Sequence, residues 1–498
     1  MPALEELKAR LVELAHLKST IAVLNWDAEV YMPTGAINSR SQTLSYLSQL
    51  LHDKFLDKEF VKILKQASKQ KSLSEHDEAL IREVQREFKR EKKLPSEFVA
   101  TLAETTSKSS HVWAKARKES DFKIFQPYLK KIVDLKRREA DYVGFKKSPY
   151  DALLDSFEPG FTAEEAWQIL EEVKDFLVPL LKKIKASTVK IDPQIIHGHF
   201  DITKQHEFNQ RITKKIGFDY DLGRLDRSTH PFTTGFHPHD VRITTRYYEE
   251  DVLSALMSSM HEAGHGLYEQ GLSHDHFGTP LGESASLGIH ESQSRLWENM
   301  VGRSKPFWDY LYPQVQAEFP KPFKKVVLKD FYQVLNMVNP ALIRVEADEV
   351  TYNLHVIIRF EIEKELIEGS ISVKDLPEIW NSKIKDYLGV DVPDDAHGVL
   401  QDIHWSSGLF GYFPTYTLGT LYAAQLYAAA KQQLPQLEGD IARGEFSSLR
   451  EWLRSHIHLH GKRYPAAELM QSATGQPIST QPYRDYITNK YSQLYKIT

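Results

Sequence analysis

The sequence predicts an almost entirely helical protein with a very small β component. Helix starts recur through the first half of the chain, whereas segments that alternate apolar and polar residues, as half-buried strands do, are scarce. The chain contains no cysteine, so the fold depends on neither disulfides nor sulfur-bound metal. Neither a repeat nor a low-complexity tract appears, so the pattern does not support a helical solenoid.

The helix starts follow capping rules. The N-terminal segment MPALEELKARLVELAHLKSTI is an amphipathic helix of mixed charge. Pro95 and Ser96 open the segment EFVATLAE, and Thr162 can form a capping box with Glu165 after the turn EPGF. We therefore expect long helices joined by short polar turns.

The middle of the chain has a different character. Between Asp192 and His239 the sequence is rich in Gly, Pro and His, and we expect irregular structure there rather than helix. The best strand candidate, DVRITTRY (Asp240 to Tyr247), follows directly. We place here the boundary between a helical front portion, about residues 1–195, and a catalytic portion, about residues 196–498.

Composition excludes two classes of partner. The 63 Lys and Arg residues nearly balance the 68 Asp and Glu residues and are interspersed with them, unlike the one-sided charge of a nucleic-acid or membrane-surface binder. The N-terminus lacks the pattern of a secretion signal, and no run of about 18 uncharged apolar residues occurs. The sequence favours a soluble, cytoplasmic protein with a small or neutral ligand.

The segment MHEAGHGLYEQG suggests a metal site. His261 and His265 are four residues apart, so on a helix they point the same way and can bind one ion from adjacent turns. Glu262 lies about 100° round the helix axis, where it can deprotonate a water molecule at the metal. Such a short motif also arises by chance, so a third ligand is needed.

The third ligand must come from another helix. A longer variant of the motif would supply a histidine from the same segment, but Tyr268 and Gly271 occupy the positions where it needs glycine and histidine. Glu291, in SLGIHESQSRLWENM, is the candidate, since two histidines and one glutamate leave a position open for water, as in catalytic zinc sites.

Two further residues on this second helix bear on the site. Glu298 follows Glu291 by seven residues on the same face and could orient a ligand histidine. An ordinary ion pair between Glu291 and Arg295 at i, i+4 is the alternative, and spacing alone does not decide between them.

The chain resembles the carboxypeptidase Taq family of metallocarboxypeptidases. Five segments appear in the family's order: DVRIT (Asp240 to Thr244), HEAGH, HESQ (His290 to Gln293), IRVEAD (Ile343 to Asp348) and GVLQDIHW (Gly398 to Trp405). The segments NWDAEVYMP, GRLDRSTHPF and ATGQPIS extend the resemblance over essentially the whole chain. One departure is GFHPHD, where a turn richer in glycine is expected; His237 and His239 there are either pocket-rim residues or, more simply, surface loop histidines.

The resemblance implies a fold and an activity. It implies a saddle-like helical molecule with a deep central groove, related to neurolysin and angiotensin-converting enzyme, and a single catalytic unit over residues 1–498. It implies one zinc ion per subunit, replaceable by cobalt, with His261, His265 and Glu291 as ligands and Glu262 as general base. It further implies a homodimer that removes single residues from peptide C-termini with broad preference, usually rejecting proline, without an organic cofactor.

Release of a C-terminal residue requires recognition of a free carboxylate. An arginine matches its geometry with two hydrogen bonds and keeps its charge, and Arg242 and Arg344 are the candidates. Their alternative role is structural pairing, for instance of Arg344 with Asp348 at i+4. Such arginines would also close one end of the groove and make the enzyme an exopeptidase.

The oxyanion of the reaction needs hydrogen-bond donors. The resemblance suggests His404 and Tyr416, in a loop that runs into a helix after Pro414, and Tyr412 for the substrate carboxylate. The tyrosines could equally be packing residues with satisfied hydroxyls. Two further residues of the loop are weaker candidates for supporting substrate binding, Gln401 and Asp402.

Other interpretations remain open. An oligoendopeptidase or a dipeptidase would share the metal, helix and base, and would differ in how the groove is closed. A non-enzymatic helical scaffold for peptides would have no reason to retain both the ligands and Glu262. The group His456, His458 and His460 repeats the i, i+4 spacing without an adjacent glutamate, and we interpret it as structural.

Overall fold

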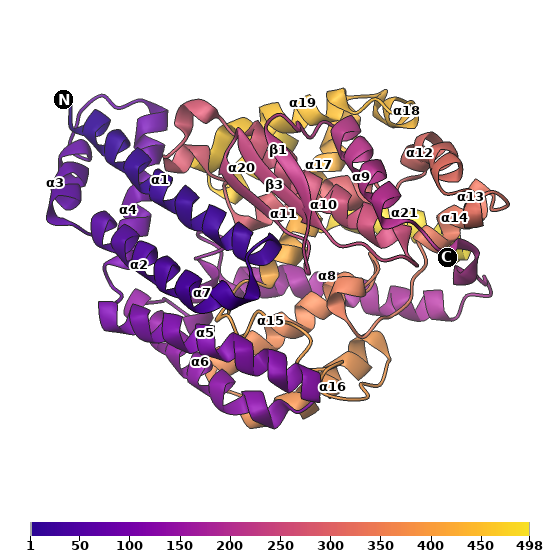
Figure 1. Ribbon diagram of the computed structural model, residues 1–498, viewed down its shortest axis with the longest axis horizontal. Helices are drawn as coiled ribbons and strands as arrows, with labels where there is room; N and C mark the ends of the chain where they lie inside the picture. The colour runs from indigo at the N-terminus through magenta and orange to yellow at the C-terminus, as the bar shows by residue number, and fades with distance from the viewer. Residues whose placement is uncertain (1, 498) are drawn as a thin grey trace. The chain divides into compact units, whose positions relative to one another are not determined.

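Helices account for nearly all regular structure in residues 2–497, which are the residues that the computed structural model describes (Figure 1). This confirms the predicted all-α fold with a very small β component. The chain divides into two compact units, each formed from three stretches of sequence. The first contains the chain through Glu91 together with Asp192–Leu335 and Tyr422–Ile478, and the second contains Lys92–Ile191, Asn336–Leu421 and the chain from Ser479 onward.

The first unit carries most of the elements. In chain order they are α1 (Ala3–Val30), η1 (Thr34–Ala36), α2 (Ile37–Phe55), α3 (Lys58–Ala67), α4 (Glu75–Glu91), η2 (Pro193–Ile196), α9 (Ile202–Ile216), β1 (Gly223–Arg227), β2 (Thr233–His237), β3 (Asp240–Thr245), α10 (Val252–Gly271), η3 (His274–His276), η4 (Pro280–Gly282), α11 (Leu287–Arg295), the π-helix η5 (Leu296–Val301), α12 (Lys305–Glu318), α13 (Pro320–Phe323), α14 (Leu328–Leu335), α18 (Leu437–Ala442), α19 (Ser447–His456), η8 (His458–Arg463) and α20 (Ala466–Thr474).

The second unit is built from long helices. They are α5 (Ser96–Glu119), α6 (Phe122–Val143), α7 (Pro149–Leu154), α8 (Ala163–Lys185), η6 (Arg344–Glu346), α15 (Tyr352–Glu368), η7 (Val373–Asp375), α16 (Leu376–Leu388) and α21 (Gln481–Tyr495), while α17 (Pro414–Gln433) contains the position in the sequence at which one unit ends and the other begins.

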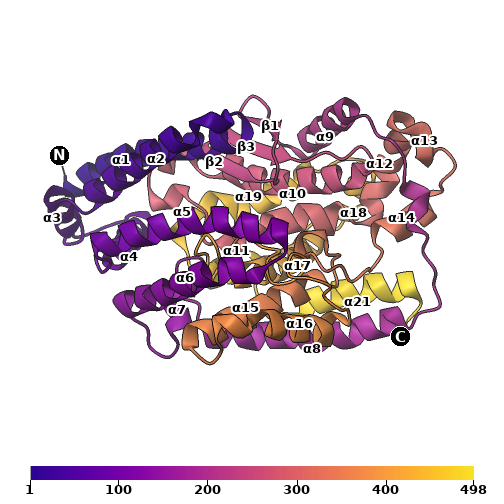
Figure 2. The ribbon, with the colours of Figure 1, turned by 60° about the horizontal axis from the view of Figure 1, so that its bottom comes forward.

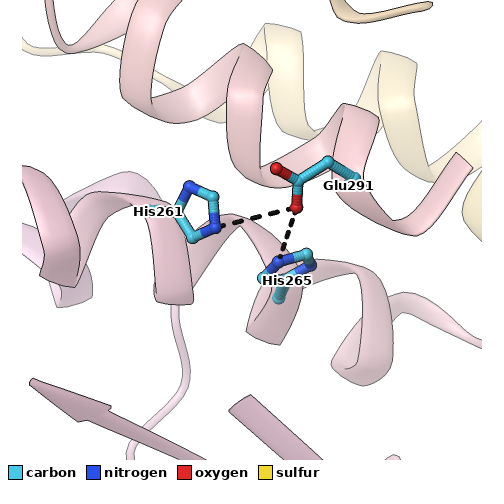
Figure 3. A group of neighbouring side chains, drawn as sticks. All are labelled: His261, His265 and Glu291. Carbon is cyan, nitrogen blue, oxygen red and sulfur yellow. Dashed lines mark ion pairs between the residues drawn. The ribbon is translucent and has the colours of Figure 1, made fainter. Parts of the chain in front are cut away.

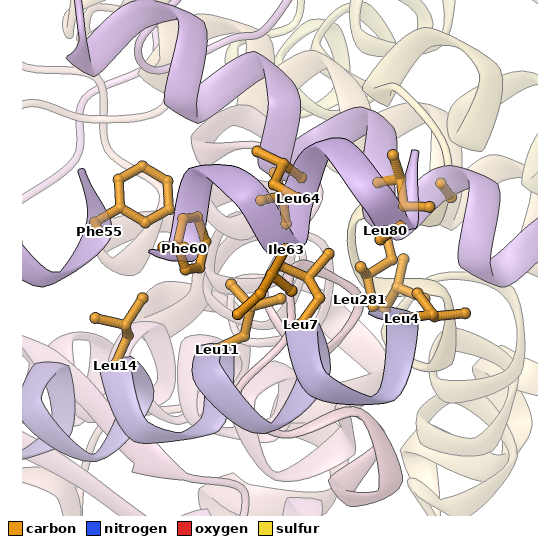
Figure 4. Packing of buried hydrophobic residues seen from close by; sticks show 14 residues of the cluster. Leu4, Leu7, Leu11, Leu14, Phe55, Phe60, Ile63, Leu64, Leu80 and Leu281 are labelled. Atoms are coloured by element: carbon orange, nitrogen blue, oxygen red, sulfur yellow. The ribbon is translucent and has the colours of Figure 1, made fainter. Parts of the chain in front are cut away.

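The predicted amphipathic N-terminal helix is present as α1. Its apolar side chains recur every three or four residues, and this stripe packs against α3 and α4 (Figure 4). The shared core is completed by residues from the neighbouring helices and from η4; the labelled members are Leu4, Leu7, Leu11, Leu14, Phe55, Phe60, Ile63, Leu64, Leu80 and Leu281.

The prediction of irregular structure between Asp192 and His239 is wrong in part, because this region contains a helix and two strands. Helix α9 buries Gln205, Asn209 and Thr213 as well as apolar residues, and each of these polar side chains donates a hydrogen bond inside the protein. A helix with a polar buried face lacks the apolar periodicity by which helices are recognised. Strands β1 and β2 flank β3, parallel and antiparallel to it respectively.

Helices α5 and α6 of the second unit lie side by side (Figures 1 and 2). Two predicted starts are confirmed: α5 begins at Ser96, and α8 begins with a capping box between Thr162 and Glu165. Helix α15 packs against α6, α7, α8 and α16 and is buried on nearly every side. In the described part of the chain, no helix is long and apolar enough to cross a membrane.

Candidate metal centre

Helix α10 places the motif histidines away from solvent. Asp251 caps its start by accepting hydrogen bonds from the backbone N–H groups of Leu253 and Ser254. The helix is buried on most of its surface, and the side chains of His261 and His265 are 19% and 15% exposed. These histidines continue the row of the buried residues Leu253 and Met257 along the helix.

A glycine between the two histidines lets a second helix approach closely. A Cβ at Gly264 would lie 2.6 Å from the backbone oxygen of Gln293 and 2.7 Å from the Cα of Ser294, both in α11. Only glycine leaves room for this contact, because a backbone cannot swing aside as a long side chain can. The close crossing of α10 and α11 brings Glu291 to the histidines.

Three side chains converge at this crossing (Figure 3). One carboxylate oxygen of Glu291, Oε2, lies 3.3 Å from Nε2 of His265 and 3.7 Å from Nε2 of His261. Within residues 2–497 this is the one group of three or more His, Cys, Asp or Glu residues whose ligand atoms all lie within 4.8 Å of one another.

The spacing fits a metal ion. Ligand atoms about 2.1 Å from a tetrahedral zinc ion lie about 3.4 Å from one another, close to the two distances from Glu291. Two imidazoles and one carboxylate form the donor set of a catalytic site, which keeps a coordination position open. The residues present therefore fit a divalent ion.

Glu291 has the geometry for both roles that the sequence left open, that of a metal ligand and that of an ion-pair partner of Arg295. Its Oε2 faces the histidines, while its Oε1 accepts a hydrogen bond of 2.7 Å from Nε of Arg295. Burial alone would raise the pKa of Glu291, but the Arg295 guanidinium and the two histidines together outweigh it and hold the pKa below the ordinary value. The carboxylate is therefore kept in the charged form that binds a cation.

Glu298 contacts His261 on the side of its ring that faces away from Glu291. It lies in the π-helical turn that continues α11, and its Oε2 is 2.9 Å from Nδ1 of His261. Arg295 donates to the same oxygen at 3.3 Å. Although burial alone would raise the pKa of Glu298, the guanidinium and the imidazole lower it to about 2. The charged carboxylate accepts from Nδ1 and leaves Nε2 of the ring free to bind a metal.

Glu262 is oriented by the sheet. Its side chain is 6% exposed, and its Oε2 accepts a hydrogen bond of 2.6 Å from the hydroxyl of Thr233 in β2. Burial raises the pKa of Glu262, which favours a carboxylate able to hold a proton between two steps of a reaction. Thr233 was not found from the sequence, because it lies 29 residues before Glu262 in the region expected to be irregular.

Two further residues that the sequence did not indicate stand behind the second histidine. Nδ1 of His265 lies 2.6 Å from Nδ1 of His290, and Nε2 of His290 lies 2.7 Å from Oε1 of Glu269. Burial lowers the pKa of His265 to about 3, so the ring is neutral and has a lone pair to offer. A signal existed for Glu269, since it lies one turn after His265 on the same helix.

Two predicted substrate residues of the second unit, Arg344 and Gln401, lie beside the carboxylate of Asp402, whose side chain is 14% exposed. Asp402 accepts hydrogen bonds from Nη2 of Arg344 at 2.9 Å and from Nε of Arg359 at 2.6 Å. Gln401 accepts from the backbone N–H of Arg344 and from Nη2 of Arg359. Asp348 is not the partner of Arg344, which corrects the suggested i+4 pair; Asp348 accepts backbone hydrogen bonds at the start of α15 instead.

The remaining candidates of this unit are neighbours. Nε2 of His404 lies 3.2 Å from the hydroxyl of Tyr416, and the Tyr412 ring packs on both residues. The Arg344 guanidinium lies 4.9 Å from the centre of the Tyr416 ring. The loop and the first turn of α17 thus gather the predicted oxyanion donors into one group.

The other predicted arginine lies in the first unit. Arg242 in β3 pairs with Asp240 at 3.0 Å, and its guanidinium lies 4.2 Å from the ring centre of Trp26. Of the histidines interpreted as structural, His458 is buried against Gln293, with 2.9 Å between Nε2 and Oε1, and His456 stacks on Trp452.

Comparison with known proteins finds one family over nearly the whole chain. The family model described as "Carboxypeptidase Taq (M32) metallopeptidase" matches residues 6–491. "Carboxypeptidase 1" of Bacillus subtilis is 40% identical over 488 residues, and "Thermostable carboxypeptidase 1" of Thermus thermophilus is 40% identical over 496 residues; each alignment covers 97% of both chains. The crystal structure of the M32 carboxypeptidase from Deinococcus radiodurans matches with a TM-score of 0.96 at 39% identity, covering 100% of both chains.

Proposed function

Because the chain belongs to the carboxypeptidase Taq (M32) metallopeptidase family, we propose that it is a zinc-dependent carboxypeptidase that releases single amino acids from peptide C-termini. The observation that carries the proposal is the convergence of His261, His265 and Glu291 beside a buried, oriented Glu262. The family resemblance implies the same roles for these four residues, three as ligands and Glu262 as the base.

The ion would be held by the two histidines and Glu291. When bound, it supplies a Lewis acid that polarises the scissile carbonyl and makes water more acidic. Glu262 takes a proton from the attacking water and later passes it to the leaving amine, a role for which its hydrogen bond to Thr233 fixes its orientation. His404 and Tyr416 donate hydrogen bonds to the developing oxyanion.

Substrate recognition is assigned to the two arginines and to Tyr412. Arg242 and Arg344 are candidates for binding the terminal carboxylate, with Gln401 holding the backbone of Arg344 in place. Broad specificity with proline disfavoured, a homodimer, one catalytic unit and cobalt as a substitute metal rest on the family resemblance. The proposed cytoplasmic location rests on the sequence pattern alone.

Peptides with blocked ends test the type of peptidase. We expect sequential release of single residues from a peptide with a free C-terminus, and no release from the same peptide when it is amidated, followed by mass spectrometry. Trimming of the amidated peptide at the same rate would refute carboxylate recognition. Internal cleavage would identify an oligoendopeptidase, and release of dipeptides a dipeptidyl peptidase.

Metal removal and one substitution test the site. A chelator should abolish activity, and Zn²⁺ or Co²⁺ should restore it. Glu262→Gln should retain one equivalent of metal and lose activity by about 10²–10⁴-fold, the usual contribution of a general base. Undiminished turnover in Glu262→Gln would place the base elsewhere, and activity unaffected by chelation would exclude the metal mechanism and leave the peptide-binding scaffold as the better explanation.

A further inference from the structure

The two candidate ligand histidines are supported in different ways. Nδ1 of His261 contacts the carboxylate of Glu298 directly, at 2.9 Å. Nδ1 of His265 contacts another imidazole, His290, at 2.6 Å, and the carboxylate of Glu269 lies behind that ring at 2.7 Å from its Nε2. The second ligand therefore reaches a carboxylate only through an intervening ring.

The positions of the protons on His265 and His290 depend on each other. Nε2 of His265 faces Glu291, so it must carry a lone pair to bind a metal, and the ring proton must then be on Nδ1. Because that Nδ1–H donates to His290, Nδ1 of His290 must be unprotonated. The proton of the neutral His290 ring is then on Nε2, where it donates to Glu269. One set of tautomers satisfies every contact.

The opposite set of tautomers is incompatible with metal binding. If His290 carried its proton on Nδ1, that N–H would meet Nδ1 of His265 and would be satisfied only if His265 moved its own proton to Nε2. Nε2 would then have no lone pair for the ion. Glu269 disfavours this arrangement, because its carboxylate can only accept a hydrogen bond and Nε2 of His290 would then carry no proton to donate.

The surroundings hold these side chains in position. The rings of His265 and His290 stack with 4.5 Å between centroids, and Tyr268 packs on His290 at 5.4 Å. At Gly235 in β2, a Cβ would lie 2.5 Å from Oε2 of Glu269, so the glycine leaves room for the carboxylate. Strand β2 is irregular between Gly235 and His237, next to this contact.

We propose that His290 and Glu269 are positioning residues that fix the tautomer of His265 and thereby raise the metal affinity of the site. The inference rests on the proposed function, since it takes His261, His265 and Glu291 as the ligands. It also makes the two histidines unequal: a carboxylate polarises His261 directly, whereas a neutral imidazole polarises His265.

The test measures binding of Zn²⁺ by competition with a chromophoric chelator, and the visible spectrum of the Co²⁺-loaded protein. His290→Ala removes the acceptor and should weaken Zn²⁺ binding about 10–100-fold, the usual loss for such partners. His290→Asn retains an acceptor oxygen near the position of Nδ1 and should restore affinity to within about threefold of wild type, with a cobalt spectrum close to that of wild type.

Glu269 offers a second pair of variants. Glu269→Gln keeps an acceptor oxygen and should bind Zn²⁺ nearly as wild type does, whereas Glu269→Leu should bind it about tenfold more weakly. His458→Asn, in a buried histidine outside the chain of contacts, is the matched control and should change thermal stability without changing Zn²⁺ affinity. Equal affinity in His290→Ala and wild type, or equal weakening in His290→Ala and His290→Asn, would overturn the inference.

Failure of the proposed function has a different outcome. In that case wild-type protein would not bind Zn²⁺ stoichiometrically, or the substitution His261→Ala would leave its Zn²⁺ affinity unchanged. Failure of the present inference leaves wild-type binding intact and sensitive to His261→Ala, so the two failures are distinguishable in the same assay.

Discussion

Each unit of this chain holds a buried cluster of acidic and basic side chains, and the two clusters differ in their balance of charge. In the first unit, Glu262, Glu291 and Glu298 surround the histidine pair, and Arg295 is the guanidinium that hydrogen bonds to two of them. Arg303 adds a positive field at Glu298. The carboxylates still outnumber the guanidiniums.

The cluster of the second unit has the opposite balance. One carboxylate, Asp402, lies between the two guanidiniums of Arg344 and Arg359, and its pKa is held well below the ordinary value: burial alone would raise it, but the two arginines outweigh that effect. Another buried acid of this unit, Glu363, has its pKa raised by burial to about 7. The carboxylate of Asp402 is thus neutralised by cations of the chain itself.

The difference bears on which cluster favours a cation from outside the chain. A surplus of buried carboxylates is stabilised by a bound cation, and the ligand geometry of the first cluster suits one. In the second cluster the Asp402 carboxylate is already paired with two cations of the chain, and no external cation is needed there. Four predictions test this contrast.

The largest effect should come from Asp402→Asn. Removing this charge leaves two buried guanidiniums without their carboxylate, and the loss of one partner from such a cluster costs about 3–5 kcal/mol of unfolding free energy. Chemical denaturation measures it. Asp394→Asn, an acid on the same unit that is 40% exposed, is the control and should change stability by less than about 1 kcal/mol. Equal effects would mean that the buried cluster carries no special stability.

The second prediction concerns the helix crossing of the metal centre. Gly264→Ala should destabilise the protein by about 1–3 kcal/mol, the usual cost of overpacking, because the added Cβ meets the backbone of α11. It should also weaken Zn²⁺ binding, since the displaced α11 carries Glu291. Gly439→Ala is the matched control: in α18 the nearest side-chain atom is 3.4 Å away, and alanine there should stabilise the helix by about 0.5–1 kcal/mol. Unchanged metal affinity in Gly264→Ala would separate the site from the crossing.

The same contrast explains what the sequence could predict. His261 and His265 were predictable because helix periodicity alone places residues four apart on one face. Glu291 became a candidate because the motif segment supplies no third histidine, and its assignment as a ligand came from the family resemblance, since spacing alone allowed an ordinary ion pair with Arg295. These predictions use contacts that are local in sequence or are required by the chemistry of a catalytic metal.

Contacts between distant segments were not predictable. Thr233 reaches Glu262 over 29 residues, and Arg359 reaches Asp402 over 43, so no periodicity links them. The suggested pair of Arg344 with Asp348 was wrong for this reason, since a local rule was applied where the tertiary partner prevailed. Helix α9 was missed because its buried face is polar.

The third prediction uses Glu363. Its carboxylate is fully buried and accepts hydrogen bonds from Tyr150, Trp405 and Gly411, and burial raises its pKa to about 7. Because an unfolded glutamate has a lower pKa, the folded protein binds the extra proton between about pH 4.5 and 7. Stability should therefore fall as pH rises through this range, by at most about 1.4 kcal/mol per pH unit.

Glu363→Gln should remove this slope while leaving the rest of the pH profile unchanged, as measured by denaturation at several pH values between 5 and 8. Parallel profiles for the variant and the wild type would show that Glu363 is ionised in the folded protein throughout the range.

The smallest effect distinguishes the two clusters most directly. If the first cluster carries a surplus of negative charge, removing one carboxylate should not harm the metal-free protein: Glu262→Gln should leave its stability unchanged or raise it by about 1 kcal/mol, as replacing a poorly compensated buried charge often does. Thermal unfolding in excess chelator measures this, with Glu59→Gln, at an acid whose side chain is 64% exposed, as the control. The sign is opposite to that for Asp402→Asn, although both substitutions neutralise a buried acid. A large destabilisation of metal-free Glu262→Gln would mean that the first cluster, like the second, is already compensated by the chain itself, and the electrostatic reason for expecting a cation there would be lost.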